Sequence, residues 1–273
     1  MNQTFGCIII QKENKLLFKN RISKSVSHIG LKILTKSPQV YKLEDYLVHN
    51  ELKENEILTT EIEDKFLILG HSLYFLINED YLGVVKQAKR TLFHFTQHGK
   101  SEEYGYKYYF KGNLCTHEIC FGENYDVFSK NWIQDNGVKL PQSIHRENAL
   151  NAFSKEKKIP LELLRLLRMS LPRKGMSSLF LHPIKQQWVY GKGMTKVNPL
   201  EVTFQELAPQ GHKRGKPFVI DKNSYEKGLL ISWSQLFYEL HQRTIKEITG
   251  FRFDYPKEFP KNLIFTKYEI FSK

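Results

Sequence analysis

Short apolar runs separated by polar residues dominate the first half of the chain. They are FGCIII (5–10), KLLFKN (15–20), KFLIL (65–69), LYFLI (73–77), YLGVV (81–85), YGYKYYF (104–110) and THEICF (116–121). Each run has the length of a strand, and branched and aromatic residues favour strands. The pattern predicts a sheet-rich segment over residues 1–140 that opens with a hairpin between 5–10 and 15–20.

Helix signals appear near residue 140, so we expect a helical hinge there. Ser143 suits the N-cap of a helix that runs through Phe153. Pro160 suits the first turn of a second helix, and Pro172 with Gly175 ends that helix. Two helices joined by a short turn separate the first half from the remainder of the chain.

Strands and one long helix are predicted beyond the hinge. The runs SLFLHP, QQWVYG and LEVTF have strand composition, and NLIFTKYEIF (262–271) predicts a last strand. Between them, residues 225–250 give the strongest helical pattern, an amphipathic helix that stops at Gly250. We therefore predict an α+β protein, with a sheet-rich domain over 1–140 and a mixed α/β domain over 141–273.

Positive charge is concentrated in the second half. The chain has a net charge of +12; residues 1–140 hold 18 basic and 17 acidic residues, whereas 141–273 hold 23 and 12. An excess on one half indicates a surface that faces a polyanion, and nucleic acid is the commonest such partner. A lysine-rich composition that serves solubility alone is the plainer alternative.

Two segments carry most of the basic residues that we expect to contact nucleic acid. On the second helix of the hinge and at its exit, these are Arg165, Arg168, Arg173 and Lys174. Leucines at spacings of three and four can bury one face of that helix while the arginines stay outside. The arrangement is compatible with a helix-turn-helix reader, but phosphate contact or plain solvation fits it as well.

The second segment is PQGHKRGKP (209–217), which we predict to be an exposed loop. Its basic residues are Lys213, Arg214 and Lys216, and its glycines let the backbone approach a phosphate. His212 lies beside them and could act as an acid or base at a bound phosphate. Nearby aromatic residues, Trp188, Tyr190 and Phe218 among them, could stack on unpaired bases or fill the core.

Residues 73–94 contain a candidate catalytic constellation. Tyr74 and Tyr81 precede a predicted helix on which Arg90 and His94 would share one face. This arrangement resembles the GIY-YIG nucleases, although the first motif reads SLY and the two tyrosines lie close together. The resemblance implies that Tyr81 activates water and Arg90 stabilises charge on the phosphate. It also implies a divalent metal ligand at Glu118 or Glu123.

A second nuclease pattern competes with the first. Asp45, Glu63 and Lys65 have the spacing of a magnesium site in which two carboxylates bind the metal and the lysine orients water. The apolar run starts only after Lys65, so Glu63 is predicted to lie in a turn. A solvated acidic loop is the simpler explanation of these residues.

The cysteines indicate free thiols. The chain has three of them, and an odd number cannot form a complete set of intramolecular disulfides. Cys115, His117 and Cys120 supply three candidate zinc ligands, one fewer than a structural zinc needs. No apolar run approaches the roughly 18 residues that cross a bilayer. We expect a cytoplasmic protein without a membrane partner.

These observations lead to a metal-dependent, site-specific DNA endonuclease of restriction or defence type as the first hypothesis. Its basic half would grip the backbone, and magnesium with Tyr81, Arg90, His94 and Glu118 would hydrolyse it. The alternative is a non-catalytic DNA- or RNA-binding module or regulator, and a protein-binding effector is a third class. We favour DNA over RNA as the partner, and the sequence leaves a homodimer open.

Overall fold

The computed structural model describes residues 4–11, 32–40, 56–70, 91–98, 103–110, 113–120, 144–170, 177–182, 184–198, 201–221, 227, 229–261 and 263–271. The described residues form two compact units. The first holds the residues up to 120 and those from 245 onward, and the second holds 144–244. Residues 245–271, which we had placed in the second domain, therefore lie with the first unit.

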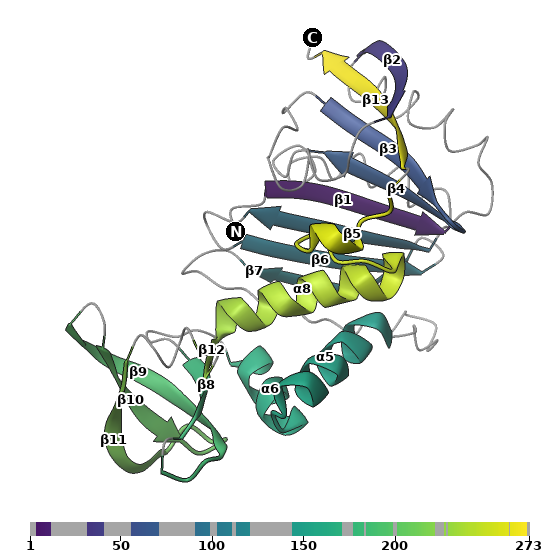
Figure 1. Cartoon of the computed structure of the whole chain (residues 1–273). Coiled ribbons are helices and arrows are strands. Elements are labelled where there is room, and N and C mark those ends of the chain that lie inside the picture. The colour runs from purple at the N-terminus through teal and green to yellow at the C-terminus, as the bar shows by residue number, and fades with distance from the viewer. Residues whose placement is uncertain are drawn as a thin grey trace. The chain divides into compact units, whose positions relative to one another are not determined.

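The first unit is built on an eight-stranded antiparallel sheet (Figure 1). Its strands are β1 (Thr4–Gln11), β2 (Lys32–Val40), β3 (Glu56–Ile62), β4 (Lys65–Gly70), β5 (Leu92–His98), β6 (Glu103–Phe110), β7 (Asn113–Cys120) and β13 (Ile264–Phe271). They lie in the order β2-β13-β3-β4-β1-β5-β6-β7. The last strand of the chain thus sits between two strands from its beginning.

The central strand β1 is buried on both faces, which explains its unbroken apolar run. Cys7 and Ile9 belong to the main core, and Ile8 on the opposite face is also fully buried. The main core also contains Ile245 and Ile248 from the end of helix α8 (Trp233–Thr249). The strand pairs with β4 on one side and β5 on the other. Both edges are taken, so the opening hairpin predicted with residues 15–20 is wrong.

Strand β5 corrects a second prediction. His94 had been assigned to a helix, one turn after Arg90, but residues 92–98 form a strand that pairs with β1 and β6. Phe93 and Phe95 face the main core, whereas His94 points to the other face and is 3% exposed. The alternation of LFHFTQH suits a strand that is buried on both sides.

The second unit combines two helices, a five-stranded antiparallel sheet and most of α8. The helices are α5 (Ile144–Lys157) and α6 (Leu161–Met169). The strands are β8 (Ser177–Leu181), β9 (Trp188–Asn198), β10 (Glu201–Leu207), β11 (Lys213–Asp221) and β12 (Leu230–Ser232), in the order β11-β10-β9-β8-β12. Antiparallel sheets and helices agree with the predicted α+β class.

The five-stranded sheet is strongly curved. Strands three positions apart in a flat sheet are separated by about 14 Å. Yet the rings of Phe180 on β8 and Phe218 on β11 have centroids only 4.6 Å apart. Gly191 on β9 permits this curvature, because the ring of Phe180 occupies the space that a side chain on Gly191 would fill. Phe180, Phe204 and Ile220 form the core on this concave face.

Helix α8 starts later than the sequence pattern indicated. Residues 230–232 form β12 instead, because Leu230 and Ile231 complete the sheet beside β8. Ser232 and Gln235 then form a reciprocal cap: the backbone N–H of each donates to the side-chain oxygen of the other. The predicted stop at Gly250 is confirmed by its φ of 90° and its hydrogen bond to the Lys246 carbonyl.

No helix within the described ranges is both long enough and apolar enough to cross a membrane.

The short 3-10 helix η1 (Pro256–Glu258) follows α8, and Lys246 Nζ donates to Glu258 Oε1 at 2.6 Å. This ion pair ties η1 to the last turn of α8 within the first unit.

Candidate nucleic-acid interface

The hairpin of β10 and β11 presents the basic segment of residues 209–217. Its turn is closed by hydrogen bonds of 2.8 Å from the Ala208 N–H to the His212 carbonyl and from the Gly211 N–H to the Ala208 carbonyl. Gly211 has a φ of 86°, a conformation that glycine adopts without strain. Residues 213–217 belong to β11, so the loop that we predicted is in part an ordered strand.

A bulge in β11 displays the centre of the basic segment. Glu206 pairs with Arg214 and Phe204 pairs with Phe218, so Gln205 alone stands opposite three residues of β11. The buried Gln205 amide donates to the carbonyl of Arg214 at 2.7 Å and to that of Gly215 at 3.3 Å. These two carbonyl oxygens therefore point into the sheet and away from its outer edge.

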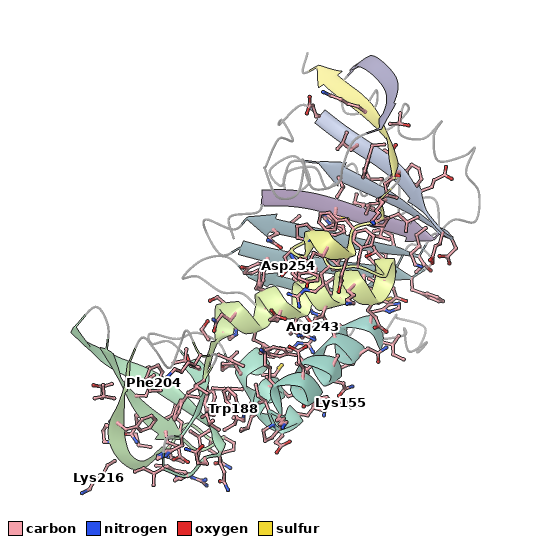
Figure 2. All side chains as sticks on the ribbon, viewed as in Figure 1. Lys155, Trp188, Phe204, Lys216, Arg243 and Asp254 are labelled. Atoms are coloured by element: carbon pink, nitrogen blue, oxygen red, sulfur yellow. The ribbon has the colours of Figure 1, made fainter. Side chains whose placement is uncertain are left out.

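Lys213, Arg214 and Lys216 are all exposed on this edge strand. Figure 2 shows Lys216 extending outward from the five-stranded sheet. Among the described residues, no acidic side chain forms an ion pair with any of the three. Glu206 lies opposite Arg214 in the register, but its carboxylate accepts a bond of 2.6 Å from Lys185 Nζ. The hairpin thus offers three cations that its described surroundings leave uncompensated.

The arginines of α6 are held differently. Arg165 and Arg168 both bond to the carboxylate of Glu147 on α5, at 3.2 Å and 3.0 Å. The side chain of Arg168 is only 14% exposed, and that of Arg165 is 55% exposed. Leu164 and Leu167 bury the opposite face of α6. Arg168 therefore fastens α6 to α5, which leaves Arg165 as the more accessible cation of this pair.

Several predicted site residues lie outside the described residues. These are Tyr81, Arg90, Arg173 and Lys174. Asp45 and Glu123, the remaining carboxylates of the two nuclease patterns, lie outside them as well. Of the three residues predicted to be catalytic, only His94 is described, and it lies on β5 rather than on a helix with Arg90. The catalytic roles of Tyr81 and Arg90 stay predictions.

Glu118 lies on β7 opposite Tyr106 and is 1% exposed. Within the described ranges, no group of three or more His, Cys, Asp or Glu side chains could hold a metal ion. The metal-binding role of Glu118 stays a prediction.

The prediction for Glu63, from the second nuclease pattern, is confirmed. Glu63 lies in the turn between β3 and β4, where Lys65 pairs with Asp64 at 2.8 Å.

Cys7 and Cys115 are free and buried in the main core. Burial raises the pKa of the Cys7 thiol well above its usual value. Burial also raises the pKa of Cys115, against the opposing effect of a hydrogen bond with the Phe110 backbone. A raised pKa disfavours the thiolate that zinc requires. Cys115 is therefore better described as a core residue than as a metal ligand.

Comparison with protein-family models, curated proteins and solved structures found no match to this chain. The sequence pointed to Lys213, Arg214 and Lys216 but missed Gln205, whose role depends on the bulge. No local sequence pattern predicts that role, because Gln205 donates hydrogen bonds to backbone carbonyls of the neighbouring strand.

Proposed function

We propose that the second unit binds nucleic acid through phosphate contacts of the β10–β11 hairpin. The observation that carries this proposal is the set of exposed cations, Lys213, Arg214 and Lys216, without an acidic partner among the described residues. Lysine and arginine contacts to phosphates supply most of the sequence-independent affinity of nucleic-acid-binding proteins. The proposal therefore concerns backbone binding and makes no claim about the base sequence.

The wider charge of the unit supports the same proposal. Residues 144–244 contain 17 basic and 8 acidic residues, which is most of the excess in the whole chain. A field of this sign attracts a polyanion and raises its association rate. The bonds from Gln205 add a local effect, because they turn two carbonyl dipoles away from the edge that a phosphate would approach.

The test measures nucleic-acid affinity as a function of salt, by fluorescence anisotropy of a labelled oligonucleotide. The variant replaces Lys213, Arg214 and Lys216 by glutamine together. The slope of log K against log salt is negative, and each lost phosphate contact reduces its magnitude by roughly 0.7 to 0.9. For the triple variant we therefore expect the magnitude of the slope to fall by about 2 to 3, with the largest loss of affinity at low salt.

A matched control removes three charges elsewhere. Lys155, Lys257 and Lys261 are exposed and lie outside the hairpin, and their replacement by glutamine gives the same net charge. The salt slope of this control should differ from the wild-type slope by no more than the change expected for one phosphate contact. Equal losses in both variants would show that affinity follows net charge alone, and the proposed hairpin site would then be abandoned.

Hydrolysis of the bound nucleic acid is the part of our first hypothesis that rests on Tyr81 and Arg90. The binding assay extends to it directly: plasmid DNA is incubated with the protein and Mg²⁺. Discrete fragments from the wild type, absent with Arg90→Ala, would establish the endonuclease. Binding without cutting in any divalent metal would leave the non-catalytic module, which is the function that the described residues support best.

A further inference from the structure

An aromatic pair lies beside the hairpin cations. Phe218 follows Lys216 by two residues on β11 and is half-buried. One neighbour is the fully buried Phe180, at 4.6 Å between ring centroids, and the other is His182, at 5.0 Å. Phe218 is therefore held by Phe180 from within the sheet, while part of the residue remains exposed.

The His182 ring is fixed by the turn that follows β8. Its Nδ1 accepts the backbone N–H groups of Ile184 and Lys185, each at 3.2 Å. Because Nδ1 accepts, the proton of the neutral imidazole is on Nε2. The imidazole thus has a set orientation against Phe218, and the two rings form a preorganised surface that loses little freedom when a ligand binds.

A cation and a ring on one edge strand suit a particular form of nucleic acid. Lys216 and Phe218 are two residues apart on β11, so the cation and the ring lie close together on the same strand. In a duplex the base faces are stacked inside the helix and cannot reach a protein ring without unstacking. In a single strand they can turn outward and stack on aromatic side chains, including histidine.

We propose that the hairpin binds single-stranded nucleic acid, with a base stacked on the Phe218–His182 surface and the adjacent phosphates on the cations Arg214 and Lys216. This inference rests on the proposed function and adds the form of the ligand to it. Stacking is tolerant of sequence because every base has a π face. The site therefore discriminates single strands from duplexes and accepts many sequences.

The test compares three labelled probes at one salt concentration: a thymidine 20-mer, a uridine 20-mer and a 20-base-pair DNA duplex. We expect at least one single strand to bind about tenfold more tightly than the duplex, and the two single strands show whether DNA or RNA is preferred. Phe218→Leu should weaken single-strand binding by roughly tenfold and leave duplex binding and the salt slope unchanged. Phe218→Tyr, which keeps the ring, should restore the affinity.

Phe218 also packs in the core, so thermal melting must show that the leucine variant is folded. A second measurement avoids any substitution: photocrosslinking of an iodouridine-containing strand to the wild type should label the peptide that holds Phe218. Equal affinity for duplex and single strands, or a crosslink elsewhere, overturns the inference. If the slope still depends on Lys213, Arg214 and Lys216 in that case, the proposed function stands; loss of that dependence removes both.

Discussion

Replacing Gly191 by alanine tests whether the curvature of the five-stranded sheet depends on a missing side chain. A Cβ at this position would lie 2.6 Å from Cε1 of Phe180 and 2.7 Å from the carbonyl oxygen of Gln205. Real Cβ atoms essentially never approach other heavy atoms this closely. Either the phenyl ring or the β10 backbone must therefore move.

Displacing either the Phe180 ring or the Gln205 carbonyl is energetically costly. The ring of Phe180 lies 5.6 Å from that of Phe204 and 4.6 Å from that of Phe218, so a shift would disturb the core of the concave face. The carbonyl of Gln205 belongs to a strand that is paired on both sides. Overpacking of this kind costs about 1 to 3 kcal/mol. We expect Gly191→Ala to fall near the upper end of that range.

Urea denaturation followed by circular dichroism measures the loss in the free energy of unfolding. The control is Gly211→Ala, in the turn of the basic hairpin, where a Cβ would meet no atom within 4 Å. Only its φ of 86° is unfavourable for alanine, at a cost of about 1 kcal/mol. If Gly191→Ala costs no more than this control, the close packing of Phe180 over Gly191 does not hold the sheet in shape.

Two further predictions concern the first unit. Gly105→Ala would clash with the Thr96 hydroxyl, a side-chain obstacle, so Gly105→Ala should be destabilising in thermal melts and Thr96→Ala should rescue most of the loss. For Glu258, burial opposes ionisation, but hydrogen bonds from Lys246 and the Arg252 N–H outweigh it and lower its pKa. Because a lowered pKa stabilises the fold above the usual range for glutamate, Glu258→Gln should be destabilising at neutral pH. The difference from wild type should shrink as pH falls through the folded pKa.

Local chemistry made part of the fold predictable. Pro160 immediately precedes α6, and Gly250 ends α8, because both act through the backbone of a few adjacent residues. The start of α8 was available in the same way: Ser232 followed three residues later by Gln235 is a capping pattern. The apolar residues before Ser232 continue the helical spacing, and this obscures the cap in the sequence.

Pairing between distant strands was not predictable from the chain. Strand β13 inserts between β2 and β3, although about 200 residues separate it from them in sequence. Its alternation specifies a strand but says nothing about its neighbours. His94 shows the limit at shorter range, because the four-residue spacing of Arg90 and His94 predicted a helix, whereas Phe93 and Phe95 alternate with His94 in a strand. Burial on both faces of the sheet decided between them.

The basic segments show that a high density of basic residues in the sequence does not by itself provide cations that are free to bind a ligand. In the sequence Arg165 and Arg168 are basic residues like the hairpin cations, but the packing of α5 against α6 brings Glu147 within 3.2 Å of both. That pairing joins residues 18 and 21 positions apart, so no local pattern contains it.

The hairpin differs because residues 207–220 contain no acid at all. A cation in such a stretch can be neutralised only by residues that the fold brings from elsewhere. For Lys213, Arg214 and Lys216 the nearest candidate in the register is Glu206, which Lys185 already engages. Exposed ion pairs such as Arg165–Glu147 contribute at most about 1 kcal/mol, so a phosphate could still compete for Arg165. At the hairpin cations no described acid has to be displaced, and phosphate contact there should dominate the salt dependence of binding.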